Sequence, residues 1–304
     1  MAPFVLHPSY ILREGLELCR LSVEVQARLE KNAQVRMFKA HFGRHPLHLS
    51  RVYRDLQVAG LMTEEEAKQK GSFIGFLLAN NFLRCYDEDD RRYSRFSEFM
   101  SRDDMVNLTE IFLNRIFALK EWKIKCPSQW PVRMGASADG THARINEPRD
   151  PEVRRNPKKF SFKHNFAGLT WLIVLSLWTN DIWYATAGDP ASTHDMTMVR
   201  EEFLEMIPEG CRVVSDSAFS GKTDEEKAKF SVVNALDSDE VKEMKARAKA
   251  RHETINTKMK FYKCLAERGR HLIEKHKRHF GCCLVLCQYA IEDTSEVGEP
   301  LMTI

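Results

Sequence analysis

Apolar residues recur at helical spacing through the first 130 residues of the chain. In segment 46–61 they stand at positions i, i+3, i+4 and i+7, the pattern of one buried face of an α-helix. Segments 73–83 and 105–119 repeat helical spacing. Pro46 suits the first turn of a helix, and Pro127 and Pro131 suit a linker. The pattern therefore predicts an all-helical region over residues 1–130.

After residue 130 the apolar residues gather in short runs rich in β-branched and aromatic side chains, which are typical of strands. These runs cover residues 132–138, 160–164, 169–178, 182–187 and 211–215. The third and fourth are close enough for a hairpin. Helical spacing returns over 195–207 and, as one long helix, over about 239–279, whereas 282–291 suits a strand or a helix. We expect a mixed α/β domain over residues 131–304, with a polar loop at 147–159.

An Asp-Gly pair, Asp139 and Gly140, interrupts the first of these strands. Asp-Gly between apolar runs is a turn signal. We therefore expect the strand to end at Asp139 and the chain to turn at Gly140.

Composition narrows the classes of protein. The chain has 304 residues, 43% of them hydrophobic, which suffices for a large core. It contains no run of 18 apolar residues and no secretory pattern at its N-terminus, so we expect no association with a membrane. Eight scattered cysteines suggest reduced thiols in an intracellular protein.

A possible DNA-binding motif lies in the helical region. Apolar residues at 37, 38 and 42, a break at Gly43 and segment 46–61 give the order helix, short turn, helix, with several basic residues nearby. Arg51 and Arg54 on the second segment are candidates for DNA contacts if this is a helix-turn-helix. The alternative is an ordinary helical hairpin.

Three acids stand at or within predicted elements of the second domain. Asp139 ends the first strand, Asp216 follows strand 211–215, and Glu253 lies in the long helix. Ligands of α/β sheets favour the carboxyl ends of strands, so these acids are candidates for a metal site. Each also has a simpler interpretation: Asp139 as a turn residue, Asp216 as a helix cap and Glu253 as a solvated helix residue.

The order of four short motifs resembles the DDE nuclease domain of Harbinger-type transposases and their domesticated relatives. These motifs are DGTH at 139–142, STHDM at 192–196, VVSDSAF at 213–219 and RHETIN at 251–256. The resemblance covers about residues 130–290 and implies an RNase H-like fold. It also implies that Asp139, Asp216 and Glu253 form the catalytic triad and that Asp195 lies near the metal.

The chemistry that the resemblance implies suits these residue types. Cleavage of a phosphodiester bond places negative charge on the attacking and leaving oxygens, which two divalent ions can stabilise. Mg²⁺ prefers carboxylate and water oxygens, so Asp139, Asp195, Asp216 and Glu253 are expected ligands, with Mn²⁺ as a possible substitute.

The long predicted helix is strongly basic. Residues 241–280 contain 13 Lys or Arg against four acids, a net charge of +9. Asn256 and Lys260 follow Glu253 by three and seven residues and share its face of the helix, so both are candidates for binding a DNA strand. The alternative is that this charge only solvates a helix face.

The sequence therefore predicts a metal-dependent DNA endonuclease or transposase located in the nucleus. The alternatives are a domesticated, catalytically silent DNA-binding or partner-binding protein of the same fold, and a purely structural α/β protein. The resemblance also allows a separate DNA-binding accessory protein and a homo-oligomer.

Overall fold

The computed structural model describes residues 3–131, 133–146, 160–161 and 165–293. The predicted loop at 147–159 and part of the predicted strand at 160–164 lie outside this range. The chain forms two compact units, each described here by itself. The helical unit comprises Met1–Lys123, Met259–Ala266 and Glu274–Ala290, and the α/β unit comprises Ile124–Lys258, Glu267–Ile273 and Ile291–Ile304.

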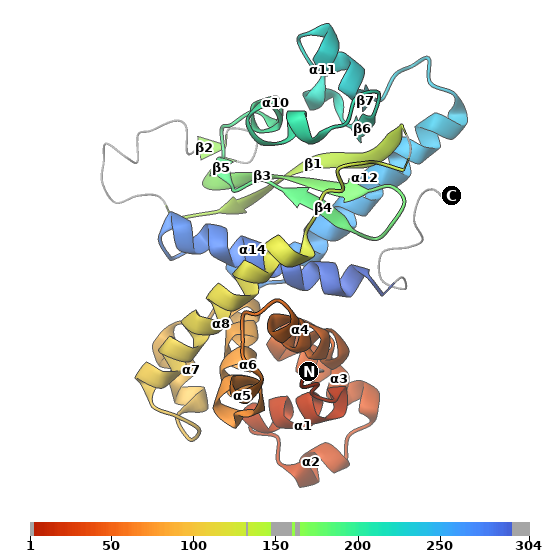
Figure 1. Cartoon of the computed structure of the whole chain (residues 1–304). Helices are drawn as coiled ribbons and strands as arrows, with labels where there is room; N and C mark the ends of the chain where they lie inside the picture. The colour runs from red at the N-terminus through yellow and green to blue at the C-terminus, as the bar shows by residue number, and fades with distance from the viewer. Residues whose placement is uncertain (1–2, 132, 147–159, 162–164, 294–304) are drawn as a thin grey trace. The chain divides into compact units, whose positions relative to one another are not determined.

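The helical unit is built from the helices drawn red to yellow in Figure 1, together with two C-terminal helices. In chain order these are α1 (Pro8–Leu18), α2 (Val23–Ala27), α3 (Lys31–Phe42), α4 (Pro46–Val58), α5 (Glu64–Lys68), α6 (Lys70–Cys85), α7 (Asp89–Phe96), α8 (Arg102–Lys123), α13 (Lys263–Ala266) and α14 (Ile273–Ile291). The three helices predicted over 46–61, 73–83 and 105–119 are confirmed as α4, α6 and α8. Membership of α13 and α14 means that the helical unit is not confined to the N-terminal 130 residues.

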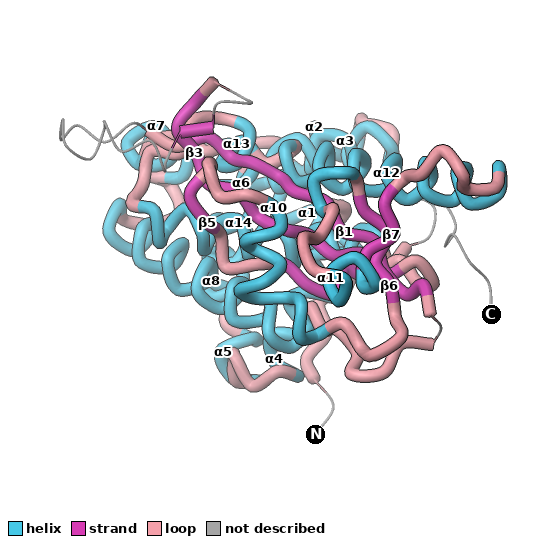
Figure 2. Tube along the Cα trace, turned by 90° about the horizontal axis from the view of Figure 1, so that it is seen from above, coloured by secondary structure: helices cyan, strands magenta, loops and turns pink. Residues whose placement is uncertain are grey.

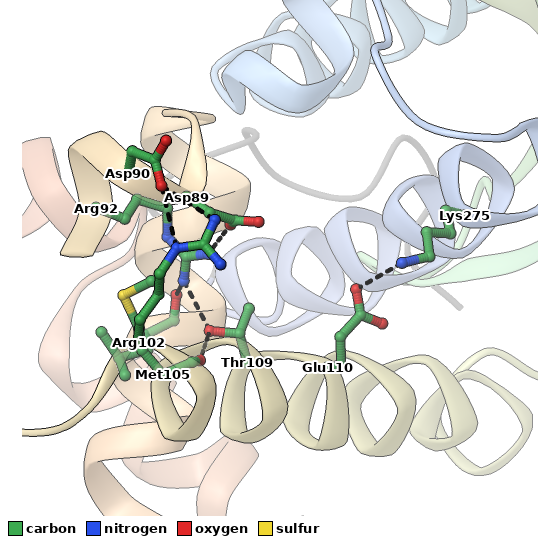
Figure 3. Close-up of polar contacts among 9 residues, drawn as sticks. Asp89, Asp90, Arg92, Arg102, Met105, Thr109, Glu110 and Lys275 are labelled. Atoms are coloured by element: carbon green, nitrogen blue, oxygen red, sulfur yellow. Dashed lines mark hydrogen bonds and ion pairs between the residues drawn. The ribbon is translucent and has the colours of Figure 1, made fainter.

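A buried arginine ties α7 to α8 (Figure 3). Arg92 is 1% exposed and donates to the Thr109 hydroxyl at 2.7 Å and to the Asp89 carboxylate at 3.2 Å. Thr109 in turn donates to the Met105 carbonyl. Burying a cation is costly unless it is hydrogen-bonded, so these contacts favour the observed packing of the two helices.

The predicted helix, turn and helix around Gly43 are present, but much of their charge is used inside the helical unit. Arg44 is buried, donates to the Leu286 carbonyl and stacks on the Tyr262 ring. Arg54 pairs with the buried carboxylate of Asp55 at 2.6 Å. Arg51 is half-buried. This arrangement favours the helical hairpin over a DNA-reading motif, because a recognition helix needs side chains free to reach the bases.

The α/β unit contains a mixed sheet with the order β2-β3-β1-β6-β7, in which β4 and β5 also pair with β3 (Figure 2). Its strands are β1 (Met134–Arg144), β2 (Phe160–Ser161), β3 (Phe166–Ser176), β4 (Ile182–Ala185), β5 (Asp189–Pro190), β6 (Arg212–Ser215) and β7 (Phe230–Val232). β1 is antiparallel to β3 and parallel to β6. The predicted hairpin is confirmed as β3 and β4.

Helices cover both faces of this sheet. On one face, Ala136 and Ala138 of β1 pack with the segment formed by α10 (Asp195–Met198) and two short helical turns, Val199–Phe203 and Leu204–Met206. On the other face lies α12 (Asp239–Lys260), whose Ala248 packs on Val214. The remaining helical elements are the turn Ser217–Phe219 and α11 (Asp224–Lys229).

Two predicted elements differ from the structure. The turn at Gly140 is wrong, because β1 runs unbroken to Arg144 and residues 136–144 pair with β3. The single helix over 239–279 is also wrong, because α12 ends at Lys260 and α13 and α14 follow. Segment 282–291, for which a strand or a helix was open, belongs to α14.

None of the described helices is long and apolar enough to span a bilayer.

Candidate active site

Two of the predicted acids open on one cavity of the α/β unit. The cavity has a volume of about 260 Å³ and lies between α12 and strands β1 and β6. Asp139 and Asp216 both line it, with Ser137, Lys245, Lys249 and His252 among the other lining residues. The prediction that Asp139 and Asp216 come together is consistent with this geometry.

The parallel register of β1 and β6 explains why these acids meet. Ser137 pairs with Val214, and each acid follows its member of that pair by two residues. Side chains two residues apart point to the same face of a strand, and neighbouring strands lie about 4.8 Å apart. Both carboxylates therefore leave the sheet on the face covered by α12, at the level where β6 ends.

Main-chain N–H groups hold both carboxylates. Oδ1 of Asp139 accepts from the N–H of Gly140 at 2.8 Å. Oδ1 of Asp216 accepts from the N–H of Ala218 at 2.8 Å and so caps the helical turn that follows. Asp216 thus has both roles. One of its oxygens caps the helical turn, and its side chain also lines the cavity.

Asp195 lies on the other side of β1. Its Oδ1 stands 2.9 Å from the point where a β-carbon on Gly140 would be. Because side chains alternate along a strand, the Gly140 position faces away from α12, whereas Asp139 faces toward it. Asp195 is therefore close to the main chain beside Asp139 but is not among the residues that line the cavity.

Because the Asp195 carboxylate lies where a β-carbon on residue 140 would be, the glycine leaves room for it. We expect Gly140→Ala to destabilise the α/β unit by at most about 1 kcal/mol, because the Asp195 carboxylate that the new methyl group meets is the end of a flexible side chain and can move aside. The measurement is denaturant unfolding followed by tryptophan fluorescence, since four of the five tryptophans lie in this unit. Gly71→Ala, where a β-carbon meets open space, should leave that transition unchanged. An equal effect of both substitutions would contradict the role of the Asp195 contact.

Glu253 lies on the exposed surface of α12 and is not a lining residue of the cavity. It follows Lys249 by four residues, so it continues the same helical stripe one turn past the cavity. Asn256 is half-buried and Lys260 is exposed on this stripe. Within the described ranges, no three His, Cys, Asp or Glu side chains are close enough to hold a metal ion. The carboxylates of Asp139 and Asp216 suit a hard divalent ion, but a third acidic ligand is not beside them.

His252 lines the cavity, whereas the neighbouring Glu253, the predicted ligand, does not. The sequence did not predict this role of His252. This histidine is 3% exposed, and its Nε2 lies 3.0 Å from the Ser137 hydroxyl. Burial lowers the pKa of His252 to about 3, so the ring is neutral near pH 7. Its position beside Glu253 in RHETIN was the available signal, but a histidine in a helix more often has a structural role.

The pKa of His252 is near 6.5 in the unfolded chain and about 3 in the folded protein. The histidine therefore contributes its full stability at pH values above 6.5, and this contribution is lost as the pH falls toward 3. We expect the free energy of unfolding to drop by about 2 kcal/mol more between pH 6.5 and pH 5 in the native protein than in His252→Gln. Urea unfolding at the two pH values measures this difference. His194→Gln, at an exposed histidine, is the control, and a pH response of His252→Gln equal to that of the native protein would contradict the assignment.

Next to His252, Arg251 anchors α12 to the end of β3. The guanidinium is buried and donates to the carbonyls of Ser176 at 2.8 Å and Thr179 at 3.0 Å. Together Arg251 and His252 fix the rotation of α12 about its axis and thereby decide which residues face the cavity.

The basic stretch at 241–280 does not form one surface. Its residues are divided between the two units. Lys245 is buried and pairs with Asp237 at 2.9 Å, and in the helical unit Lys275 pairs with Glu110 at 3.1 Å (Figure 3). The cations that line the cavity are Lys242, Lys245 and Lys249.

Residues 138–288 match the family described as DDE superfamily endonuclease. No curated protein matches the chain. The matched segment contains Asp139, Asp195, Asp216 and Glu253, and proteins of this superfamily generally use divalent metal ions. Residues 138–288 are thus similar to the DDE superfamily endonucleases, which points to a nuclease-like or transposase-like function.

Proposed function

We propose that the chain is a metal-dependent DNA endonuclease of the Harbinger transposase type, with an RNase H-like fold. The observation that carries this proposal is the meeting of Asp139 and Asp216 on one cavity. The family match over residues 138–288 supports it, as does a mixed sheet covered by helices on both faces.

The proposed catalytic residues are Asp139, Asp216 and Glu253. Asp139 and Asp216 would hold Mg²⁺ or Mn²⁺. Glu253 and Asp195 are the other proposed ligands, and because neither lines the cavity, each would have to move to reach an ion held there. A bound divalent ion supplies Lewis-acid stabilisation of charge on the phosphate oxygens. The chain itself holds the two aspartates in place through the N–H groups of Gly140 and Ala218.

The substrate strand is proposed to lie along the stripe of α12 that includes Lys249 and Asn256 of the α/β unit. Lys260 is a separate proposed DNA contact, on the part of the helix that belongs to the helical unit. Lysines beside paired carboxylates suit a phosphate backbone, since they offset its charge while the acids occupy the site of cleavage. Arg51 and Arg54 remain proposed DNA contacts of the helical unit, although the pairing of Arg54 with Asp55 lowers its availability.

The test is to incubate purified protein with supercoiled plasmid DNA in Mg²⁺ or Mn²⁺ and then in excess EDTA. We expect nicked or linear DNA only when the metal ion is present. Intact plasmid under every metal condition, from protein that binds DNA, would reject the endonuclease.

One observation favours a second candidate, a domesticated and catalytically silent DNA-binding protein of the same fold. Glu253 stands outside the cavity that Asp139 and Asp216 line. This candidate predicts binding that weakens steeply with salt and no cleavage even with Mn²⁺.

As parts of the same proposal, the protein acts in the nucleus, where its DNA substrate lies. A separate DNA-binding accessory protein and a homo-oligomer are the proposed protein partners. Size-exclusion chromatography with light scattering tests the oligomer directly.

A further inference from the structure

The cavity that Asp139 and Asp216 line also has apolar walls. The side chains of Val214, Val233, Ala246 and Ala248 contribute to these largely apolar walls. A bare phosphate gains nothing from such walls, because burying a charge against apolar surface is costly. The ligand that fits them therefore has an apolar part.

The same cavity carries cations along one side. Lys242, Lys245 and Lys249 line it, and they lie on α12 at spacings of three and four residues, which gives one stripe. Lys245 is committed to Asp237 and to the Val232 carbonyl. Lys249 and Lys242 are exposed, and Lys242 is only loosely paired with Asp239 at 3.7 Å. The ligand therefore also has a negatively charged part that these lysines can meet.

Polar groups at the base of the cavity add hydrogen-bonding capacity. Ser137 lines it, and His252 reaches the Ser137 hydroxyl from the opposite wall. The two ring nitrogens of an imidazole can donate or accept hydrogen bonds, and the Nε2 atom of His252 already lies 3.0 Å from the Ser137 hydroxyl. The polar floor of the cavity can therefore hydrogen-bond with the polar edge of a heterocycle.

The volume limits how much can enter. Pockets for drug-sized ligands usually measure about 300–1,000 Å³, and this cavity measures about 260 Å³. One flat ring system fits, whereas a stacked run of bases does not.

We propose that the cavity takes one unstacked base of the DNA strand, whose phosphate lies at Asp139 and Asp216 and whose neighbouring phosphates meet Lys242 and Lys249. The assignment rests on the proposed function in that DNA is the substrate. The apolar walls pack on the base, and Ser137 and His252 face its polar edge. Drawing one base out of the stack would expose the adjacent phosphodiester to the carboxylates.

The experiment compares two fluorescently labelled single strands of about 12 nucleotides, a usual site size for single-strand binding. One strand carries mixed bases and the other is abasic with the same phosphates. Binding is measured by anisotropy in Ca²⁺, a hard ion that carboxylates bind, and gel electrophoresis of the same samples confirms that no strand is cut. The native protein should prefer the base-bearing strand by about tenfold, the factor given by burial of roughly 60 Å² of apolar surface.

A matched pair of variants locates the effect. Ala246→Phe fills the cavity from an exposed position, whereas Ala250→Phe adds the same ring one turn further along α12, at a residue that does not line the cavity. We expect Ala246→Phe to abolish the preference for bases and Ala250→Phe to keep it. Circular dichroism confirms that both variants are folded.

Equal affinity of the native protein for both strands overturns the base pocket, and so does an equal loss of preference in the two variants. Plasmid cleavage is scored separately on the same preparations. Cleavage without a base preference leaves the endonuclease standing and removes only the pocket, whereas no binding of either strand and no cleavage removes both.

Discussion

Asp139→Asn and Asp216→Asn are each expected to lower the rate of DNA cleavage by about 10³-fold or more, because each removes several kcal/mol of charge stabilisation at the cleaved phosphate. Asparagine has nearly the same shape as aspartate. It can still accept from the N–H of Gly140 or Ala218, so the fold around the cavity is retained. The measurement is the rate of plasmid nicking in Mn²⁺, with affinity for DNA measured in parallel.

Asp224→Asn is the control for these variants, since Asp224 is exposed at the start of α11 and does not line the cavity. Its cleavage rate should match that of the native protein. Glu253→Gln is tested in the same series and is expected to lose activity as the third proposed acid. Full activity of Glu253→Gln would remove this residue from the site and leave the pair, whereas full activity of both aspartate variants would end the proposed mechanism.

Arg251→Met is expected to destabilise the α/β unit by about 2–4 kcal/mol, because the carbonyls of Ser176 and Thr179 lose charged hydrogen-bond donors in a buried place. The methionine fills much of the space, so the loss reflects hydrogen bonds more than a cavity. Urea unfolding followed by tryptophan fluorescence gives the free energy. The loss of this anchor should also lower DNA cleavage, since α12 is then less firmly oriented toward the cavity.

Arg247→Met is the matched control. Arg247 lies one turn earlier on α12 and is exposed, so its substitution should change the free energy of unfolding by less than about 0.5 kcal/mol. If the two substitutions cost the same, Arg251 does not anchor the helix.

Local patterns predicted the elements that local interactions decide. Helices α4, α6 and α8 follow from apolar spacing, and the hairpin of β3 and β4 follows from two apolar runs with a short connection. The turn at Gly140 was predicted wrongly because Asp-Gly is a local signal, whereas pairing of residues 136–144 with β3 keeps this stretch extended. The Asp195 carboxylate beside Gly140 is a tertiary contact as well. No neighbour in the sequence of Gly140 carries that information.

The long helix was predicted wrongly for a similar reason. No glycine or proline lies near its end at Lys260. Two residues later the Tyr262 ring is fully buried, stacked under the Arg44 guanidinium, and a β-carbon on Gly43 would come within 2.6 Å of it. Burial of this one ring, which depends on residues more than 200 positions away, breaks the helical path.

The site was predictable where it depended on strand ends and unpredictable where it depended on helix rotation. Asp139 and Asp216 could be placed together from the order of strands. The face of α12 could not, because Arg251 and His252 set it through contacts with β3 and β1. The lysines and the neutral histidine of the cavity were therefore not foreseen as a group.

The hydrogen bonds from the N–H groups of Gly140 and Ala218 order the two aspartates before any ligand binds. Each aspartate is held by an N–H within two residues of itself, so its rotamer is chosen when the chain folds. A ligand that meets these carboxylates then finds them already ordered and loses little side-chain entropy on arrival. The entropic cost of assembling this pair is thus borne by folding of the sheet and is absent from each encounter with a ligand.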